Sequence, residues 1–455
     1  MARGKKIASS KVTILPKEKQ PFPVPENWFW TDIDSINQYS GLSIDPMKQP
    51  DTTFELYSVP SSADDYPEII TGSEIGSVKQ SVIKNDVLLC KINPRINRVW
   101  KISQYTDNEL MASSEWIIIR NSVINPDYLM FCFRTQYFRE FMLSNVSGVG
   151  GSLMRAQPKF VKKYPIPIAP ITEQQRIVDR IESLFAKLDE AKEKVQAVVD
   201  DFELRKSAIL HKAFTGELTV KWRQTHGVTL DSWETSNLSD RFEIVGGVQK
   251  KPSRTPKDNP IPYLTVANVF RDRIDLSELR YFEVFDGELD KLRLQDKDIL
   301  VVEGNGSGNE IGRCAMWHCE LPICIHQNHI IRLRATDSET MPEYVLYFLN
   351  SSAGKSIMKE RAKTTAGLFN LSTGKIKTIP VPFATVSEQK EIVRILDSFL
   401  TQEQQAKEAA EAVLAQIDTM KKAILARAFR GELGTNDPAE EWAGELVKKL
   451  LNEEV

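Results

Sequence analysis

Two long stretches of the chain carry apolar residues at spacings that alternate between three and four. The first stretch covers positions 177–209 and the second covers positions 392–424. Such spacings place the apolar side chains on one face of an α-helix, as in a heptad seam. A Pro-x-Pro run precedes each stretch, and Gly216 or Gly431 follows it, where a left-handed C-terminal turn needs glycine. The pattern predicts two helices of about 40 residues, each a rod of roughly 60 Å.

The ends and faces of these helices can be assigned more closely. Thr172 and Gln175 have the spacing of a capping box at the start of the first helix, whereas Lys390 replaces the capping glutamine in the second. Glu403 is the one charged interruption of the second seam. The residues expected to pair the two helices are Ile181, Leu184, Leu188, Val195, Val198, Phe202, Leu396, Phe399, Val413, Ile417, Met420 and Ile424.

The two helices belong to an internal duplication. Residues 165–218 and 380–433 align at a constant offset of 215 without a gap, and 22 of the 54 aligned positions are identical. Weaker similarity is also found outside this segment. For example, Asn125-Pro126-Asp127-Tyr128 resembles Met341-Pro342-Glu343-Tyr344, which lies 216 positions later. Two matched helices separated by a domain most simply pair with each other in antiparallel orientation.

Mixed, strand-rich sequence precedes each helix, which predicts an α+β fold built from two similar halves. Turn residues separate short β-branched or aromatic runs, and each half also has one helical stretch. In the first half the expected strands include 82–83, 87–89 and 116–119, with a helix near 128–143; in the second they include 299–302 and 330–333, with a helix near 343–359.

The expected domain organisation follows from these elements. It comprises a basic N-terminal arm at 1–27, a strand-rich domain at 28–169, a spacer helix at 170–219, a second strand-rich domain at 220–384, a distal spacer helix at 385–433 and an acidic tail at 434–455.

Length and composition exclude several classes of protein. At 455 residues the chain is long for one compact core, and 41% hydrophobic with 27% charged residues excludes a wholly disordered protein. No run reaches the roughly 18 apolar residues of a membrane helix, and no apolar segment follows the basic start as in a secretory signal. Five cysteines are too few for a disulfide framework. The expected location is the reducing cytoplasm.

The net charge of −3 hides basic stretches, because residues 432–455 alone hold seven acids against two lysines. Residues 91–101 and 146–163 carry four bases each and no acid, while 355–377 carry six bases and one acid. Small-residue loops lie within the last two, and small residues let backbone amides approach phosphates. For any one stretch, ordinary solvated surface is the alternative. The candidate DNA-binding residues are Lys91, Arg95, Arg98, Ser147, Gly150, Ser152, Arg155, Lys159, Lys163, Asn305, Ser307, Asn309, Arg313, Gln327, Asn328, Lys355, Lys363, Thr364, Asn370 and Lys377.

A zinc site is a weaker interpretation of the second half. Cys314, His318, Cys319, Cys324, His326 and His329 fall within sixteen residues. Their spacing lacks a tight Cys-x-x-Cys pair, so strand packing is the preferred interpretation and no metal is assigned. Residues 326–329 (His-Gln-Asn-His) are instead candidate polar readers on a strand edge, since amide side chains suit adenine.

Intrinsic catalysis has little support in the sequence. Residues 125–128 and 302–306 are weak matches to the motifs of amino methyltransferases, and nothing supplies an acidic residue for an adenosine ribose. No Walker loop occurs. No catalytic residue is therefore assigned, and intrinsic methyl transfer is a minor alternative.

The repeated motif resembles that of the specificity subunits of type I restriction-modification enzymes. It consists of Pro-Ile-Pro-x-Ala-Pro-x-x-Glu-Gln, a long helix and residues 213–223 (Ala-Phe-Thr-Gly-Glu-Leu-Thr-x-Lys-Trp-Arg), and part of it recurs at 428–433. The resemblance covers essentially the whole chain. It implies two target recognition domains that each read one half of a split site in double-stranded DNA, joined by two antiparallel helices that act as a spacer.

The same resemblance implies that the chemistry resides in partner subunits. Two methyltransferase subunits would dock on the helices and methylate adenine N6 with S-adenosylmethionine, and motor-nuclease subunits would use ATP and Mg. This chain would then hold no cofactor and contact no membrane. The alternative function is a non-DNA scaffold or coiled-coil adaptor.

Overall fold

The structure is a computed structural model that describes residues 12–148, 154–285, 287–305, 310–362 and 369–446. The chain divides into two compact units. Unit 1 comprises residues 1–195 and 412–455, and unit 2 comprises residues 196–411. Each unit therefore contains one strand-rich region and parts of both long helical segments.

The two long helical segments are confirmed. The first consists of α5 (Ile171–Asp200) and α6 (Phe202–Phe214), which are separated at Asp201, and the second is the continuous α13 (Val386–Ala428) of 43 residues. Gly216 and Gly431 follow them with φ of +80° and +75°, as predicted. A Cβ on Gly431 would lie 2.3 Å from Pro25 Cγ, so the close approach of the chain also requires glycine there.

The predicted capping box is wrong. Thr172 lies inside α5, where its hydroxyl donates to Glu440 Oε1 at 2.7 Å, and Gln175 Nε2 donates to Asp179 Oδ1 at 2.8 Å. The helix begins directly after Pro170, whose carbonyl accepts from Gln174 N at 2.9 Å.

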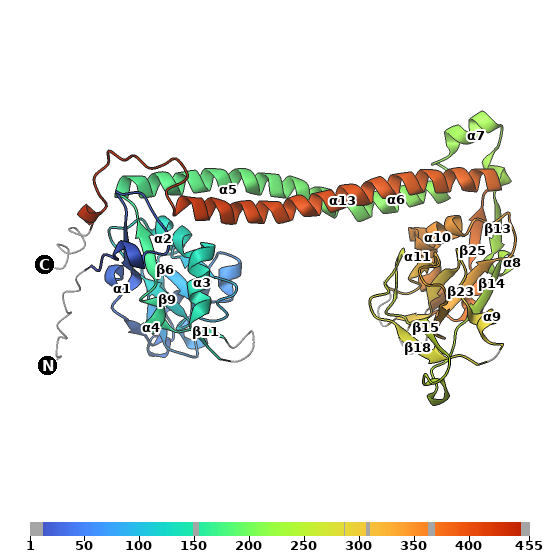
Figure 1. The fold of residues 1–455 in the computed structure, drawn as a ribbon, viewed down its shortest axis with the longest axis horizontal. Coiled ribbons are helices and arrows are strands. Elements are labelled where there is room, and N and C mark those ends of the chain that lie inside the picture. The colour runs from blue at the N-terminus through green and yellow to red at the C-terminus, as the bar shows by residue number, and fades with distance from the viewer. Residues whose placement is uncertain (1–11, 149–153, 286, 306–309, 363–368, 447–455) are drawn as a thin grey trace. The chain divides into compact units, whose positions relative to one another are not determined.

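The helices pair antiparallel within each unit, and Figure 1 shows α5 beside the final part of α13 in unit 1. There Lys421 Nζ lies 2.5 Å from Asp189 Oδ1, and Lys192 Nζ lies 3.8 Å from Asp418 Oδ1. In unit 2, Arg205 Nε lies 2.8 Å from Glu403 Oε2, across α6 and α13. The charged residue that interrupts the second seam therefore has an oppositely charged partner on the other helix.

Burial divides the predicted pairing residues into three groups. Ile181, Phe202, Leu396 and Ile417 are buried, and Leu184, Leu188, Val195, Phe399 and Ile424 are half-buried. Val198, Val413 and Met420 are 42%, 40% and 47% exposed and lie outside the buried seam. Two helices bury only the stripe between them, so apolar positions at the rim of that stripe keep contact with solvent.

The strand-rich region of unit 1 contains a five-stranded sheet of order β2-β5-β8-β3-β4 and a three-stranded sheet of order β7-β6-β9. The strands are β1 (Phe29–Asp32), β2 (Ser43–Ile44), β3 (Thr53–Tyr57), β4 (Glu68–Thr71), β5 (Lys79–Ser81), β6 (Val87–Cys90), β7 (Val99–Lys101), β8 (Glu109–Ala112), β9 (Trp116–Ile119), β10 (Val146–Ser147), β11 (Arg155–Ala156) and β12 (Pro165–Ile168). The helices are α1 (Ile33–Ile36), α2 (Pro126–Phe133), α3 (Gln136–Ser144) and α4 (Pro158–Val161), with short 3-10 turns at Lys17–Lys19, Pro46–Lys48, Ser61–Ala63 and Gly72–Glu74.

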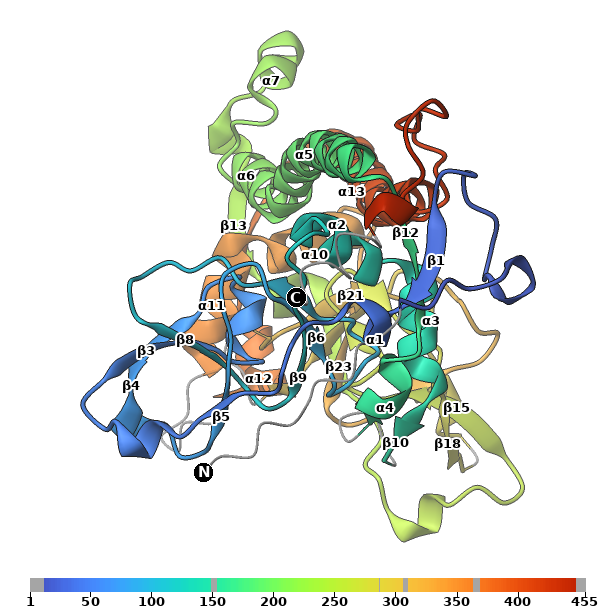
Figure 2. The ribbon, with the colours of Figure 1, turned by 90° about the vertical axis from the view of Figure 1, so that its left-hand side faces the viewer.

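The strand-rich region of unit 2 has a four-stranded sheet of order β14-β23-β19-β21 and a three-stranded sheet of order β18-β15-β22. The strands are β13 (Glu234–Asn237), β14 (Phe242–Gly246), β15 (Pro260–Leu264), β16 (Val269–Phe270), β17 (Arg273–Ile274), β18 (Arg280–Glu283), β19 (Ile299–Val302), β20 (Gly304–Asn305), β21 (Cys314–Met316), β22 (Ile325–His326), β23 (Ile330–Ala335), β24 (Phe369–Asn370) and β25 (Pro380–Phe383). The helices are α7 (Val220–His226), α8 (Leu238–Arg241), α9 (Leu289–Leu292), α10 (Pro342–Asn350), α11 (Ser352–Ala362) and α12 (Thr373–Lys377), with 3-10 turns at Leu230–Ser232 and Pro252–Arg254. Figure 2 shows α7 standing off α6 and α13.

The predicted α+β class is confirmed, with two local corrections. Residues 82–83 follow β5 rather than forming a strand. Each predicted single helix is a pair, because Thr135 accepts from Phe138 N at 3.2 Å and starts α3, while Ser351 is extended and separates α10 from α11. The first and last strands of each region pair antiparallel, β1 with β12 and β13 with β25. The proline-rich runs are therefore the last strands before the long helices.

The duplication extends to buried polar contacts at the start of each long helical segment. Trp28 Nε1 donates to Glu173 Oε2 at 2.7 Å, and in unit 2 Trp233 Nε1 donates to Glu388 Oε2 at 2.9 Å. Both glutamates are fully buried. Burial of a carboxylate is tolerated only when it is hydrogen-bonded, so each unit needs further donors at this point.

The segment that follows the partner helix supplies those donors. In unit 2, Arg223 Nη1 and Thr219 Oγ1 both donate to Glu388 Oε1 at 2.6 Å. In unit 1, Asn436 Nδ2 donates to Glu173 Oε2 at 2.8 Å and Thr435 Oγ1 donates to Oε1 at 3.3 Å. The repeat therefore preserves the position of each buried glutamate but only unit 2 neutralises it with arginine.

Candidate nucleic-acid interface

Two basic stretches of unit 1 meet beside the end of β6. Ala156 N donates to Lys91 O at 2.9 Å, and Asn93 N donates to Met154 O at 2.8 Å. Ile92 and Arg155 form an antiparallel bridge. The fold thus joins the basic stretches 91–101 and 146–163, which the sequence left as separate candidates, into one surface.

The cations of this surface differ in how far other groups engage them. Arg95 is exposed, and it is in no ion pair within the described chain. Lys159 is also exposed, and its amino group lies 4.8 Å from the centre of the Phe160 ring. Arg155 Nη2 lies 3.3 Å from Glu115 Oε1, and Lys163 Nζ lies 3.5 Å from Asp34 Oδ2. These pairs are exposed and weak, so all four cations remain able to contact a phosphate.

The remaining candidates of unit 1 take fixed positions nearby. Lys91 Nζ donates to Ser114 O, and Arg98 is half-buried. Ser147 is exposed on β10 and pairs with Arg155 on β11. Gly150 and Ser152, which lie between these strands in sequence, are outside the described residues.

Unit 2 places its candidates at the corresponding point of its fold. Leu371 N donates to Glu303 O at 2.7 Å, as Ala156 N does to Lys91 O in unit 1. β20 and β24 pair through Gly304 and Asn370, which brings the candidates Asn305 and Asn370 onto neighbouring strands. Asn370 is exposed; the side chain of Asn305 is not described. Ser307, Asn309, Lys363 and Thr364 lie outside the described residues.

The candidate readers at 326–329 separate into two groups. His326 is buried, its Nδ1 lies 2.9 Å from Ile330 O, and burial lowers its pKa to about 4, so its prediction as a reader is wrong. Gln327 and Asn328 are half-buried and more accessible. His329 is exposed, and its Nδ1 lies 3.0 Å from Glu303 Oε2. This contact holds the turn against the end of β19.

The three other described cationic candidates of unit 2 differ in how far each side chain is buried or hydrogen-bonded. Arg313 is half-buried and donates to Val266 O at 3.1 Å, so the protein itself engages it. Lys355 and Lys377 are exposed. Partial burial lowers the pKa of Lys355, and the positive charges of Arg271 and Lys206 lower it further.

Sequence reasoning missed Lys250 and Lys251. Both are exposed, and they follow Val248, which forms a parallel bridge with Gln327. Asn328 N also donates to Val248 O at 2.9 Å. The paired lysines in the sequence were the available signal, but their proximity to the amide side chains depends on that bridge.

The Cys/His segment shows no metal-binding arrangement in the part of the chain that the structure describes, where no three His, Cys, Asp or Glu side chains gather suitably. Cys314 and Cys324 are buried, and burial raises the pKa of each thiol to about 12. Cys319 is exposed. A metal needs thiolates, and apolar burial opposes their formation.

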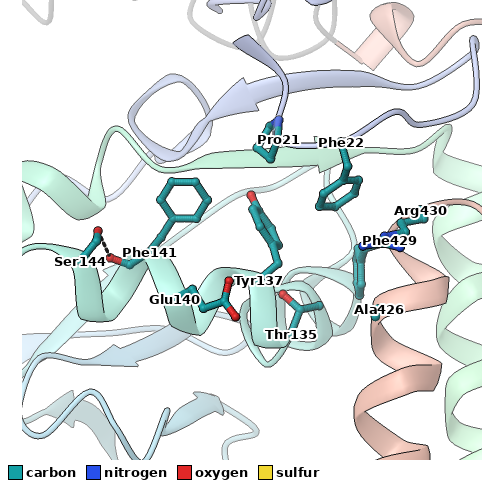
Figure 3. Close-up of a pocket in the computed structure, with 10 residues that line it drawn as sticks. All are labelled: Pro21, Phe22, Thr135, Tyr137, Glu140, Phe141, Ser144, Ala426, Phe429 and Arg430. Carbon is teal, nitrogen blue, oxygen red and sulfur yellow. Dashed lines mark hydrogen bonds between the residues drawn. The ribbon is translucent and has the colours of Figure 1, made fainter. Parts of the chain in front are cut away.

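An apolar hollow in unit 1 involves the segment predicted as an N-terminal arm. The hollow measures about 470 Å³, and Figure 3 shows Phe22 beside Phe429 and Arg430, with Tyr137 and Phe141 on α3. The ring centre of Phe22 lies 5.2 Å from that of Tyr137. The described part of the arm is thus partly packed, and the hollow offers aromatic contact rather than a catalytic set.

Comparisons with known proteins agree with this arrangement. A family model described as the type I restriction modification DNA specificity domain matches residues 231–412. The EcoKI specificity subunit of Escherichia coli K12 is 30% identical over 320 residues, which are 68% of this chain and 68% of that protein. The StySPI specificity subunit of Salmonella potsdam is 26% identical over 311 residues, which are 68% of this chain and 66% of that protein.

Solved structures show the same fold. One chain, from a structure concerned with complex assembly and conformational transition of the type I R-M system, aligns with a TM-score of 0.73 and 20% identity over 90% of this chain and 100% of its own. The HsdS subunit of Thermoanaerobacter tengcongensis aligns with a TM-score of 0.59 and 20% identity over 90% of this chain and 99% of its own. None of the described helices is long and apolar enough to cross a membrane.

Proposed function

The chain belongs to the specificity subunits of type I restriction enzymes, and we propose that each of its strand-rich regions reads one half of a split DNA target. The surface beside β6 would read the first half and the surface beside β19 the second. Amide side chains of the second surface match the hydrogen-bonding edge of adenine, and the cations of the first match phosphate.

One observation carries this proposal. In both units the backbone N–H of the residue after the candidate loop donates to the carbonyl of the residue after the central strand, Ala156 to Lys91 and Leu371 to Glu303. Two unrelated loops would have no reason to share this attachment. The equivalence supports two reading surfaces of one kind that differ in their side chains.

The chemistry is proposed to lie in partner subunits. Two methyltransferase subunits with S-adenosylmethionine would dock on the paired helices, and motor-nuclease subunits would contribute ATP and Mg. This chain would act by binding and orienting DNA without a catalytic residue of its own. Membership of the family supports this division of labour, and reconstitution with purified partners tests it.

Replacing Arg155, Lys159 and Lys163 together by alanine is expected to weaken DNA binding by the reconstituted complex. Each lost phosphate contact removes about 0.9 from the slope of log K against log salt, so the slope should fall by about 2.7. Fluorescence anisotropy at several salt concentrations measures this slope.

The control replaces two exposed cations of unit 1 that lie outside the long helices and the candidate surface, Lys48 and Lys84, by alanine. This control should leave the slope within error of the wild-type value. A loop triple variant that keeps the wild-type slope would remove this surface from the DNA interface.

A further inference from the structure

A second hollow in unit 1, separate from the apolar one, has four cationic side chains among the residues that line it. Its volume is about 560 Å³. The lining residues are Ser62, Ala63, Ile96, Asn97, Arg98, Val99, Arg134, Gln136, Arg139 and Lys422. Of the basic residues, Arg98 precedes β7, Arg134 directly follows α2, Arg139 lies in α3 and Lys422 lies in α13, so distant parts of the sequence converge here.

The hollow concentrates positive charge. Four cations line it, Arg98, Arg134, Arg139 and Lys422, and the lining contains no carboxylate. None of the four forms an ion pair within residues 12–148, 154–195 and 412–446, the described part of unit 1. Like charges gathered in a concave site repel one another and raise the free energy of the unliganded protein.

One donor in the hollow is buried and unused. Arg139 Nε has no hydrogen-bond partner, although it is shielded from solvent. A buried N–H without a partner is energetically costly, so such groups are rare in folded proteins. Partial burial also lowers the pKa of Arg134, although Asp65 and Asp127 act on it in the opposite sense. Of these two acids, Asp127 is already paired with Lys101 at 2.5 Å.

The corresponding corner of unit 2 also contains cations. Lys355 in α11 corresponds to Arg139 at the offset of 216 that relates Asn125 to Met341. Lys206 Nζ lies 2.5 Å from Asp272 Oδ2, and its counterpart in unit 1, Lys421, is paired with Asp189. The four cations that line the hollow of unit 1 have no such ion pair in the described part of that unit.

We infer that the hollow of unit 1 binds phosphate groups. Guanidinium groups present paired N–H donors that match two phosphate oxygens, and Arg134 and Arg139 bring two such groups to one cavity. Arg134 Nη2 already donates to Val99 O at 3.0 Å, so Arg134 would bind a phosphate through its remaining donors. Ser62, Asn97 and Gln136 add neutral polar groups to the lining. A ligand oxygen at Arg139 Nε would also satisfy the buried donor.

Two sources can supply this phosphate. One is the backbone of bound DNA, and that source rests on the proposed function. The other is a free phosphoanion such as pyrophosphate or a nucleotide, which does not depend on it. The chemistry is shared, and the volume admits more than one phosphate group in either case.

The test compares the full-length chain, in complex with its partners, with the double variant Arg134→Gln/Arg139→Gln. The control is the double variant Lys48→Gln/Lys84→Gln, which removes two exposed cations of unit 1 outside the long helices and the hollow. The readouts are the salt slope of duplex DNA binding and the melting temperature with and without pyrophosphate.

A DNA source predicts that the slope falls by about 1.8 in the hollow variant alone, since each contact contributes about 0.9. A free source predicts an unchanged slope. In that case, pyrophosphate at 100 times its dissociation constant raises the melting temperature by about 5 °C or more in the wild type but not in the variant. Either source predicts that the unliganded variant at low salt melts no lower than the wild type, because charge repulsion has been reduced.

Three results would overturn the inference. The first is a hollow variant whose salt slope and response to pyrophosphate both equal those of the wild type. The second is a lower melting temperature of the unliganded variant than of the unliganded wild type. The third is a wild-type protein that is stabilised by polyglutamate and not by phosphate. The two proposals can fail separately. If the salt slope falls in the Arg155/Lys159/Lys163 variant, and the hollow variant changes neither the slope nor the response to pyrophosphate, the hollow is rejected and the proposed function is retained.

Discussion

A fragment of residues 1–225 is expected to form a dimer with a twofold axis. In unit 1 the end of α13 completes the hydrophobic core, since Leu425, Ala428 and Phe429 are buried against the strand-rich region and α5. The fragment lacks α13, but Leu210 and Phe214 of α6 occupy the aligned positions. A second copy of the fragment can therefore provide the missing contacts.

The polar contacts of the repeat favour the same dimer. The fragment retains Trp28 and Glu173, and it also contains Thr219 and Arg223, which belong to the segment that satisfies the other buried glutamate in the full chain. In the dimer, Thr219 and Arg223 of one copy would bind Glu173 of the other. At roughly 1.5 kcal/mol or more per buried large side chain, the exchanged apolar contacts alone favour association. An interface made by identical surfaces closes as a twofold dimer.

Analytical ultracentrifugation of the fragment measures this association. The control pair is Leu210→Lys, which should abolish the dimer because Leu210 is 2% exposed, and Leu204→Lys, which should preserve it because Leu204 is 69% exposed. With methyltransferase subunits the dimer should direct methylation to an interrupted palindrome made of the first half-site. A monomeric fragment would contradict the equivalence of the two helical segments.

Replacing Arg223 by methionine is expected to lower the free energy of unfolding by about 3–5 kcal/mol. Glu388 is fully buried and would lose its only cationic partner in the described chain while Thr219 and Trp233 remain. An unpaired buried carboxylate is costly because the surrounding protein solvates it poorly. Urea unfolding of the full chain, followed by the tryptophan fluorescence of unit 2, measures the loss.

The structure offers two controls for this prediction. Asn436→Ala removes a neutral donor from Glu173 in unit 1, so it should cost less, about 1.5–3 kcal/mol. The double variant Arg223→Met/Glu388→Met removes both charges and should recover most of the loss. Equal losses in the single and double variants would mean that packing of Arg223, rather than its charge, stabilises the site.

The sequence predicted the helices well because their apolar period and duplication are local and repeated signals. It failed where the decisive contact lies elsewhere in the chain or in the backbone. The helix α5 begins directly after Pro170 rather than at Thr172, and the turn at Thr135 divides a stretch whose apolar pattern is that of one helix. Glu403 interrupts the apolar seam of its own helix, and the sequence did not identify its partner because Arg205 lies on the other helical segment.

The candidate interface was predictable only in part for the same reason. Composition identified the basic stretches and the amide-rich turn, but not the backbone contacts that join Lys91 to Ala156. The sequence suggested His326 as a residue that contacts bases. Its burial excludes that role, and burial depends on the tertiary structure, which the sequence pattern does not show. Arg134, Arg139 and Lys422 carried no joint signal, since α3 and α13 are far apart in sequence and only the fold brings them to one hollow.

The most direct test of the two-surface account is a chimera in which residues 234–383 are replaced by the corresponding region of a specificity subunit with a different target. Long-read sequencing of DNA methylated by the reconstituted complex would give the motif of the chimera and of the wild type. The account predicts that one half of the split motif changes to that of the donor while the other half is retained. A motif that changes in both halves, or in neither, would contradict it.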